Sequence, residues 1–521
     1  MNKKITGLLL ALSIGISVQV FAQDETDALR YSRTTPGGTA RAQAIGGAMG
    51  SLGGDYSAAH VNPAGLGFFR TNEFVISPGY YFINSSATYR GSTTPDESRS
   101  GMQLPNIGVV FGMPTPTKSA WKNFSVSLGY NRVANFNNKQ FTKANNNEHS
   151  LTERWLEDLA FNNVPYDRAG KDYPLGASLA FNTFLVDTAL SNGAPNGYKT
   201  RVNPRTGLLQ QDRLEEKGGM DEFAIGFAGN YMDRLYIGGS INISNIHYES
   251  HREYAEDDIS GNNSNEFDFF ELISDRKTDG LGVNIKLGAI YAATSNLRIG
   301  AAFHTPTWYN MKDVSSAGLL VNTENFVSPV TGKNENYQTT GDVIEDGGPV
   351  EFEYSYRTPL KALGSVSYIF GTNPDISKQH GFITADVEYV NYATSKYKYK
   401  GSAEIQDQGK AMNASISNLY KSTVNVRIGG ELKFTTLAVR GGFAYYGDPY
   451  QHASVDASVK KISGGVGYRN RGFFVDLTYV HTLANDEYYP YFLAQDDGMP
   501  VKPAAIDRSG GAVVATIGFK F

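Results

Sequence analysis

The 521-residue chain has no cysteine, only 20 prolines and no apolar run of 18 residues after its first 22. Without cysteine, disulfide scaffolds, iron–sulfur clusters and cysteine-ligated zinc sites are excluded. The apolar fraction of 40 % is too low for a bundle of helical membrane spans. Basic residues are not in excess either, since the formal net charge is −5. Nucleic acid is therefore not an expected partner, because the chain has no excess of basic residues to neutralise its phosphates.

Aromatic residues and glycine are abundant instead. The chain has 32 Tyr, 29 Phe and 56 Gly. Disordered chains are poor in aromatic residues, so disorder is excluded over most of the length. The composition predicts a folded protein of unusual type.

The first 22 residues resemble an export signal. Lys3 and Lys4 precede an uncharged apolar stretch over 5–16, and Val20 and Ala22 offer suitable side chains for a cleavage site. This pattern predicts a signal peptide over 1–22, removed after Ala22. A transmembrane anchor is disfavoured because the stretch is shorter than about 20 residues.

Segments of about ten residues with alternating character follow along the chain. From 281 to 292, the odd positions carry Leu, Val, Ile, Leu, Ala and Tyr, while the even positions include Gly, Asn and Lys. A period of two puts the two sets on opposite faces of a strand. Fourteen such strands are expected: 72–86, 105–114, 123–141, 221–231, 235–250, 280–293, 297–308, 358–370, 380–397, 422–433, 437–446, 459–469, 472–483 and 511–521.

The connections between these strands alternate between short and long. The long ones include 142–220 and 309–357. A soluble β-sandwich has no reason to sort its loops in this way, whereas an outer-membrane barrel has short turns on one side and long loops on the other. The sequence thus predicts an all-β fold, with residues 72–521 forming a 14-stranded antiparallel transmembrane barrel in the outer membrane of a Gram-negative bacterium. Outer-membrane lipid and lipopolysaccharide are then expected partners.

The last strand has the pattern of an outer-membrane protein. Val513, Ile517, Phe519 and Phe521 share one face, and the sequence stops on the last of them. In outer-membrane proteins a final strand of this kind is recognised by the barrel-assembly machinery, which is therefore an expected partner.

Residues 23–71 do not alternate and are rich in small side chains. Gly-rich and Ala-rich stretches lead to Asn62-Pro63-Ala64, just before the first strand. A flexible tail would also be Gly-rich. Here, however, apolar residues are interspersed among the small ones, so we expect a compact segment inside the barrel.

Residues 37–69 resemble the N-terminal region of the FadL/TodX family of outer-membrane transporters of hydrophobic compounds. The resemblance lies in the Gly- and Ala-rich start, a Gly-Asp pair and the Asn62-Pro63-Ala64 motif. It implies that this segment is a hatch plugging a fourteen-stranded barrel, with the motif associated with ligand passage. It also implies passive uptake of long-chain fatty acids or related hydrophobic molecules, by way of a loop groove, a lumen pocket, a hatch movement and a side opening. Residues 23–36 make the N-terminal region longer than in the best-known members.

Loop 142–220 contains a candidate capture groove. Ser150 and Glu153 match a capping box, which predicts a helix with Trp155 and Leu159 on one face. A second apolar cluster includes Phe181 and Phe184. These four apolar side chains either line a groove for the ligand or only pack the loop against the barrel rim.

Other arrangements give weaker signals. The eight histidines are scattered, so no metal site and no cofactor is expected. Haemin remains an alternative ligand, since it is large and apolar and some proteins of this type in Bacteroidetes-like bacteria carry haemin-receptor labels. A barrel enzyme is a third alternative, but His304 and His481 lack a local nucleophile motif. Lumen-facing charged residues are expected to form a satisfied network more readily than a conduit: Lys286, Asp386, Glu388, Arg427, Glu431 and Asp476.

Overall fold

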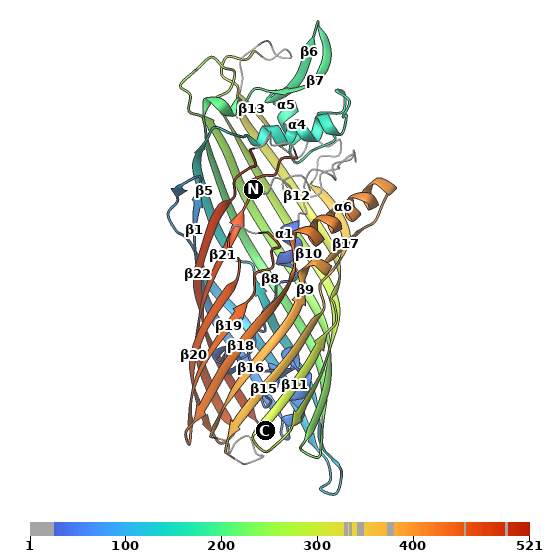
Figure 1. Cartoon of the computed structure of the whole chain (residues 1–521), viewed down its shortest axis with the longest axis vertical. Helices are drawn as coiled ribbons and strands as arrows, with labels where there is room; N and C mark the ends of the chain where they lie inside the picture. Colours follow the sequence, from blue (N-terminus) through green and yellow to red (C-terminus); the bar gives the residue numbers. More distant parts are fainter. Residues whose placement is uncertain are drawn as a thin grey trace, which may run out of the picture.

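The chain forms one closed β-barrel in a computed structural model, which describes residues 25–327, 332, 336–340, 349–371, 380–452, 455–494 and 499–521. Neighbouring strands pair antiparallel all around the wall, and β1 (Glu73–Tyr89) pairs with β22 (Ala504–Lys520) to close it. Figure 1 shows the tall barrel with a hairpin and helices at one end and further short helices inside the other. The 14-stranded antiparallel barrel expected from the sequence is confirmed.

The remaining wall strands follow one another in chain order, and four of the fourteen are interrupted and so carry two labels. They are β3 (Glu97–Pro114), β4 (Trp121–Asn135) with β5 (Asn138–Asn146), β8 (Leu208–Tyr231), β9 (Leu235–Asp258), β10 (Phe269–Ala292), β11 (Leu297–His304) with β12 (Trp308–Asn322), β14 (Val350–Arg357) with β15 (Lys361–Phe370), β16 (Gly381–Asn391) with β17 (Lys396–Tyr399), β18 (Ser422–Lys433), β19 (Leu437–Tyr446), β20 (Val459–Asn470) and β21 (Phe473–Tyr488). Short strands outside the wall are β2 (Ser92–Thr93), β6 (Val186–Ser191), β7 (Ala194–Thr200) and β13 (Asn336–Thr340).

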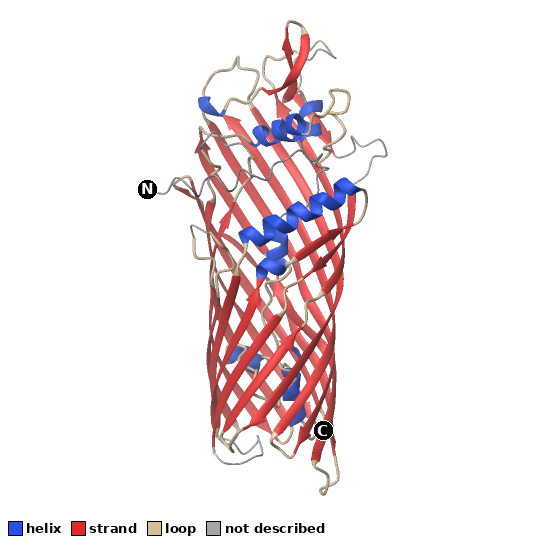
Figure 2. Cartoon of the chain, turned by 45° about the vertical axis from the view of Figure 1, so that its right-hand side comes forward, coloured by secondary structure: helices blue, strands red, loops and turns tan. Residues whose placement is uncertain are grey.

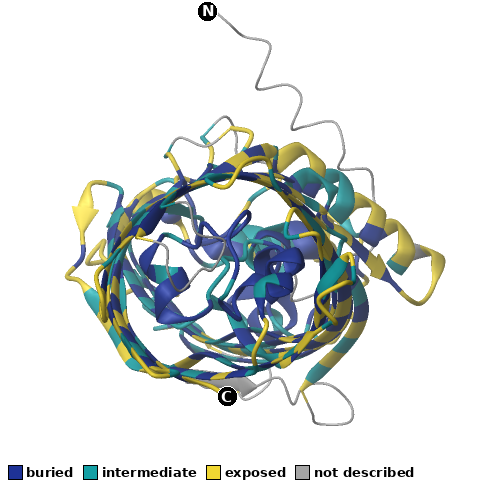
Figure 3. Cartoon of the chain, turned by 90° about the horizontal axis from the view of Figure 1, so that it is seen from below, coloured by how far each residue is buried: buried dark blue, intermediate teal, exposed yellow. Residues whose placement is uncertain are grey.

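The outer face of the wall carries an apolar band. On β10, Leu281, Val283, Ile285 and Leu287 point outward and are 42–59 % exposed, while the alternate Lys286 is buried in the lumen. Seen along the barrel axis, exposed residues form the outer surface and buried ones fill the inside (Figure 3). Such a band is what a bilayer requires of a barrel's exterior, so the wall is built to span a membrane.

Several strands continue beyond this band and are longer than the sequence predicts. β9 extends to Asp258, eight residues past the expected end, and β10 begins at Phe269, eleven residues before the expected start. Their outer faces there carry charged residues, as in the cross-strand pair of His251 with Asp275. The lumen face in this region mixes apolar residues such as Phe270 and Leu272 with charged ones such as Glu256, and the outer face has lost its continuous apolar set. The regular hydrophobic alternation on which the prediction depended is therefore absent. The long connection expected over 142–220 is accordingly reduced to 147–207.

Turns at one end of the barrel are short, and connections at the other end are long. We call these the short-turn end and the long-loop end. Helices lie at both levels: α1 (Glu25–Arg30), α2 (Ala40–Ala44), α3 (Ala58–Val61) and the 3₁₀ helix η1 (Pro63–Phe68) belong to the first segment, whereas α4 (Leu151–Phe161), α5 (Ala177–Asn182) and α6 (Ala403–Leu419) belong to long-loop-end connections. Figure 2 shows short helices of the first segment low in the barrel and the helices of the long loops higher up, and α1 lies beside α6 rather than with the lower helices. The short 3₁₀ helices η2 (Pro204–Thr206) and η5 (Tyr392–Thr394) complete the set. No helix in the described part of the chain is long and apolar enough to cross a bilayer.

Candidate functional site

Residues 37–69, which we call the plug, fill the short-turn end of the lumen. α2 packs against β19 to β22, and η1 packs against β4 and β8 to β10 on another part of the wall. Thr39 caps α2 by accepting from Ala42 N, and Asn62 caps η1 by accepting from Ala64 N at 3.1 Å, with Pro63 at the first helical position. Small residues allow this compact crossing, because larger ones would collide with the wall.

The Asn62-Pro63-Ala64 motif attaches the plug to the barrel wall. Asn62 Nδ2 donates to the Gly50 carbonyl at 2.6 Å and approaches the carbonyls of Ala289 and Ala301 at 3.3 Å each. All three residues of the motif are buried. The motif therefore holds the plug against β10 and β11, and any passage of a ligand beside it requires these contacts to change.

Ion pairs join the plug to the opposite wall. Arg41 of α2 binds Glu431 with an Nε–Oε2 distance of 3.0 Å, and Glu431 also binds Arg440 at 2.5 Å. Asp386 accepts from Gly50 N at 3.2 Å and lies 3.5 Å from Arg427. The remaining predicted lumen charges are paired too, in Lys286–Glu222, Arg427–Glu388 and Arg440–Asp476. Each of the predicted lumen charges thus has a partner of opposite sign, as expected from the sequence, and they form no open conduit. Their hydrogen bonding is incomplete, because buried atoms of Arg427, Arg440 and Asp476 have no hydrogen-bond partner among the described residues.

Residues 25–36, which we call the N-terminal segment, lie above the plug in a chamber rich in tyrosine. We define the tyrosine chamber by Tyr248, Tyr309, Tyr354, Tyr356, Tyr392, Tyr397, Tyr399 and Tyr420, which cluster with Met220, Ile246 and Met311. Tyr31 occupies its interior with no exposed surface and makes edge-on ring contacts with Phe136, Tyr248 and Tyr356 at centroid distances of 6.1–6.4 Å. The N-terminal segment and the tyrosine chamber together close the middle of the lumen.

Charged contacts hold α1 at the edge of the tyrosine chamber. The Asp27 carboxylate receives two hydrogen bonds from Arg276, at 2.8 and 3.0 Å, and also pairs with Arg30. Arg30 in turn lies 3.0 Å from Glu216. Two small adjoining cavities, of about 40 and 50 Å³, separate the N-terminal segment from the plug and are lined with Glu222, Lys286, His304 and Lys361 among others.

Residues 147–207 with α4 and α5 form a cap over the long-loop end. The predicted capping box of Ser150 and Glu153 is present, and α4 follows it. Trp155 and Leu159 are buried, 3 % and 0 % exposed, in a cluster with wall residues such as Phe270. Phe181 packs against that cluster, and Phe184 lies 5.6 Å from Phe326 between ring centroids. Contact of a ligand with Trp155 or Leu159 would therefore require the cap to open, whereas Phe181 and Phe184 are only partly buried.

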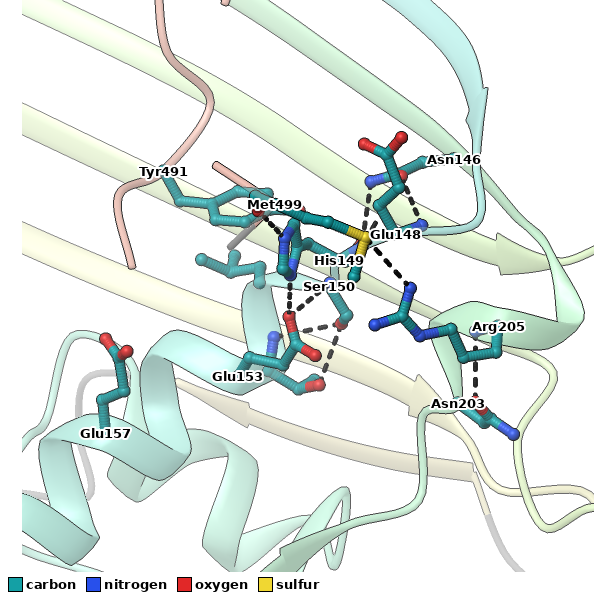
Figure 4. Close-up of polar contacts among 12 residues, drawn as sticks. Asn146, Glu148, His149, Ser150, Glu153, Glu157, Asn203, Arg205, Tyr491 and Met499 are labelled. Carbon is teal, nitrogen blue, oxygen red and sulfur yellow. Dashed lines mark hydrogen bonds and ion pairs between the residues drawn. The ribbon is translucent and has the colours of Figure 1, made fainter. Parts of the chain in front are cut away.

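A buried carboxylate anchors the cap to the barrel. Glu256 of β9 accepts hydrogen bonds from Ser150 Oγ at 2.5 Å, Leu151 N at 2.9 Å, Gln210 Nε2 at 2.9 Å and Tyr254 OH at 2.7 Å. Beside it, His149 contacts Glu153 and the main-chain carbonyl of Met499, as Figure 4 shows. Ser150 is therefore engaged as a helix cap and anchor, and His149 is turned toward other partners rather than toward the serine oxygen.

The wall is interrupted on one side, where β4 bends. The β3–β4 ladder runs only from Asn106–Asn131 to Pro114–Asn123, and within the described structure residues 97–105 of β3 pair with β1 alone. Beyond the bend, β5 pairs with β8 and contacts β1. Side-chain ion pairs bridge the interruption, since Glu97 lies 3.1 Å from Arg213 and Arg99 lies 3.9 Å from Glu215. We call this interruption the side seam.

The histidines do not gather into one site. His60 of the plug lies 3.6 Å from Glu222, and His304 Nε2 contacts the Val61 carbonyl at 2.9 Å, so both support the plug. His247 and His251 lie outside the barrel, each 2.7 Å from an aspartate of β10. No group of three or more metal-ligating residues of suitable geometry occurs among the residues that the structure describes.

Two features of this site were not foreseen from the sequence: the tyrosine chamber, and the pairing of Arg276 with Asp27. The family resemblance implied a side opening but did not give the position of the seam. A weak signal for the chamber exists, because Tyr354 and Tyr356, like Tyr397 and Tyr399, repeat with the strand period. For Arg276 and the seam no local signal exists, since both depend on which strands lie opposite.

Comparison with known proteins identifies the fold. No family model and no curated protein sequence matches the chain. Among solved structures, a FadL homologue of Pseudomonas aeruginosa is similar over 94 % of this chain and 100 % of its own, with a TM-score of 0.54 and 14 % identity. The toluene transporters TodX of P. putida (TM-score 0.49, 13 % identity) and TbuX of Ralstonia pickettii (0.46, 14 %) each cover 93 % of this chain and 99 % of their own. The first likeness shows that the chain has the FadL-type fold.

Proposed function

We propose that this protein is a FadL-type outer-membrane channel for the passive uptake of hydrophobic compounds, with long-chain fatty acids as the favoured class. The observation that carries the proposal is the combination of a lumen closed along its axis with a wall interrupted at its side. A general porin needs an open lumen. Here the plug, the N-terminal segment and the cap close it, whereas the side seam has side-chain contacts in place of a hydrogen-bonded ladder.

The proposed route has three stages. A hydrophobic molecule enters through the cap, near Trp155, Leu159, Phe181 and Phe184, and reaches the tyrosine chamber. A movement at Asn62-Pro63-Ala64 then lets it pass toward the side seam and so to the membrane. Each stage requires one of the contacts described above to open. These contacts are the packing of the cap, the packing of Tyr31 in the tyrosine chamber, and the hydrogen bonds of Asn62.

Uptake along this route needs no energy-coupling chemistry. Lipopolysaccharide hinders direct partitioning of apolar solutes, and an apolar chamber returns about 0.8 kcal/mol for each methylene removed from water. A downhill gradient then suffices. The engaged states of Ser150 and His149 favour a channel over an enzyme at the cap.

Export and membrane assembly complete the proposal. Residues 1–22 lie outside the described residues, and we propose that they are a signal peptide removed after Ala22. The mature chain would then be inserted by the barrel-assembly machinery, with its long-loop end toward the outside, in contact with lipid and lipopolysaccharide.

The test is to identify what the protein carries and what it admits. We expect organic extraction of purified protein, followed by mass spectrometry, to yield fatty acid or a similar lipid. We also expect cells lacking the protein to take up labelled hydrophobic compounds more slowly. A strong haem absorbance band with no lipid would replace this proposal with a haemin receptor, and unchanged uptake would refute the channel.

A further inference from the structure

We propose that the N-terminal segment occupies a ligand site as an internal substitute, and that this site takes an amphipathic carboxylate: Arg276 binds the carboxylate, and the tyrosine chamber binds the apolar body. This inference rests on the proposed function, to which it adds the residue that recognises the carboxylate and the segment that occupies the site. A piece of the chain with the same chemistry, Asp27 with Tyr31, occupies this place.

Asp27 and Tyr31 have the arrangement of such a ligand. They are four residues apart, which places the carboxylate and the ring on the same side of the turn that links them. Arg276 binds the Asp27 carboxylate through both terminal nitrogens, the geometry in which a guanidinium holds a free carboxylate. Tyr31 meanwhile fills the chamber with its ring.

Arg276 and the tyrosine chamber form one continuous site. The guanidinium of Arg276 lies 5.2 Å from the ring centre of Tyr248, and Tyr248 is in edge-on contact with Tyr31 at 6.4 Å. A ligand whose carboxylate took the place of Asp27 would therefore direct its apolar body along Tyr248 into the space now held by Tyr31.

The fit of Tyr31 is incomplete. Its hydroxyl is fully buried and has no hydrogen-bond partner among the described residues, and the same holds for the hydroxyl of Tyr397 in the chamber. Burying a polar group without a partner is costly. A ligand with an apolar body in place of Tyr31 would avoid the cost of burying this hydroxyl. Such a ligand can therefore displace the N-terminal segment from the chamber.

Displacement of the N-terminal segment would also break contacts at the side seam. Thr35 N donates to the Val133 carbonyl at 2.9 Å, and Asn131 Nδ2 donates to the Pro36 carbonyl at 2.9 Å, both at the bend of β4. These contacts are made by the same N-terminal segment that fills the chamber. Filling the site with ligand would thus release the strand that borders the seam.

The experiment measures binding of hexadecanoate, 2-naphthoate and hexadecanol to the full-length protein in detergent. We expect Arg276→Gln to weaken binding of a carboxylate probe about tenfold or more, while hexadecanol binding changes less than about twofold. We expect Asp27→Asn to strengthen carboxylate binding by about threefold or more, because occupancy by the chain's own segment lowers apparent affinity. Lys277→Gln, on the outer face beside Arg276, is the matched control.

The two substitutions separate recognition from structural support, because both break the same ion pair. A purely structural role for the pair predicts that both shift affinity in the same direction, and that result would overturn the proposal. Equal loss of hexadecanol and carboxylate binding in Arg276→Gln would also overturn it. If the unsubstituted protein bound none of the three probes, the proposed function itself would fail.

Discussion

Gly288 in the barrel wall and Asn62 in the plug approach so closely that a Cβ atom on Gly288 would lie 1.8 Å from Asn62 Oδ1. Gly238 on the neighbouring strand stands in the same relation to Pro63, with a contact of 2.6 Å to its carbonyl carbon. The wall therefore has a recess that fits the motif, and the recess is made by the absence of side chains.

Replacing Gly288 by alanine should displace the motif without unfolding the barrel. The added methyl group competes with Asn62 for one position, whereas the strand itself gains, because glycine inside a strand is less favourable than alanine. We expect channel conductance in planar bilayers and sensitivity of cells to large polar antibiotics to rise. Gly364→Ala is the control, because its Cβ would meet nothing within 4 Å. Equal behaviour of the two variants would show that the recess does not hold the plug.

A disulfide between plug and wall should block uptake reversibly. A Cβ on Gly226 of β8 would lie 3.8 Å from the Cβ of Ala59 in α3, the spacing typical of a disulfide. The chain has no cysteine of its own, so the pair A59C/G226C would be the sole thiols. We expect oxidation to stop uptake of a labelled hydrophobic compound and reduction to restore it. The two single variants control for the substitutions, and uptake that persists under oxidation would show that the plug need not move.

Removing the Glu256 carboxylate should loosen the cap. Glu256→Ala deletes the acceptor of four hydrogen bonds at the start of α4, and bonds to a charged group are worth about 1.5–3 kcal/mol each. We expect the amides of α4 to exchange with solvent at least about tenfold faster while those of β9 to β10 stay protected. Glu249→Ala, on the exposed face of the same strand, should leave α4 unchanged. If the α4 amides stay protected from exchange in both variants, groups other than Glu256 anchor the cap.

The cap should become more stable in mild acid. Burial raises the pKa of Asp158 in α4 from 3.8 to about 6, against the opposing effect of the Arg154 guanidinium. Because the folded pKa exceeds the unfolded one, the folded cap binds a proton first, so its stability rises as pH falls from about 6 toward 4 and is lower above pH 6. The full difference is roughly 3 kcal/mol. We expect Asp158→Asn to remove this dependence, as measured by the opening free energy of α4 from hydrogen exchange at several pH values. A dependence that survives the substitution would belong to another group.

The sequence predicts the barrel well and the lumen poorly, for a physical reason. Within the apolar band, alternation follows directly from having lipid on one face, so strands such as 281–292 are visible in one dimension. Above the band, β9 has polar residues on both faces, and its continuation to Asp258 is not visible. The interruption between β11 and β12 coincides with Pro306, which cannot donate to the ladder, whereas residues 136–137 between β4 and β5 carry no such local signal.

The candidate site is predicted only where it is local in sequence. Asn62, Pro63 and Ala64 are adjacent, and the capping box of Ser150 and Glu153 spans four residues, so both can be found by inspection. The tyrosine chamber takes residues from β9, β12, β14 and β17, and Asp27 meets Arg276 across 249 positions. Such pairs emerge only when the barrel closes.

The pairing of β1 with β22 has a consequence for assembly. These strands are the first and last of the wall, and the plug is joined directly to the first. The plug is synthesised first but can reach its final position only after the last strands are made. Its helix α2 packs against the last strands of the wall and its helix η1 against earlier ones, and these two parts of the wall are joined only when the β1–β22 ladder forms. Sealing the wall and enclosing its contents are one event, and a plug left outside at that moment would have to enter through an open end of a finished cylinder.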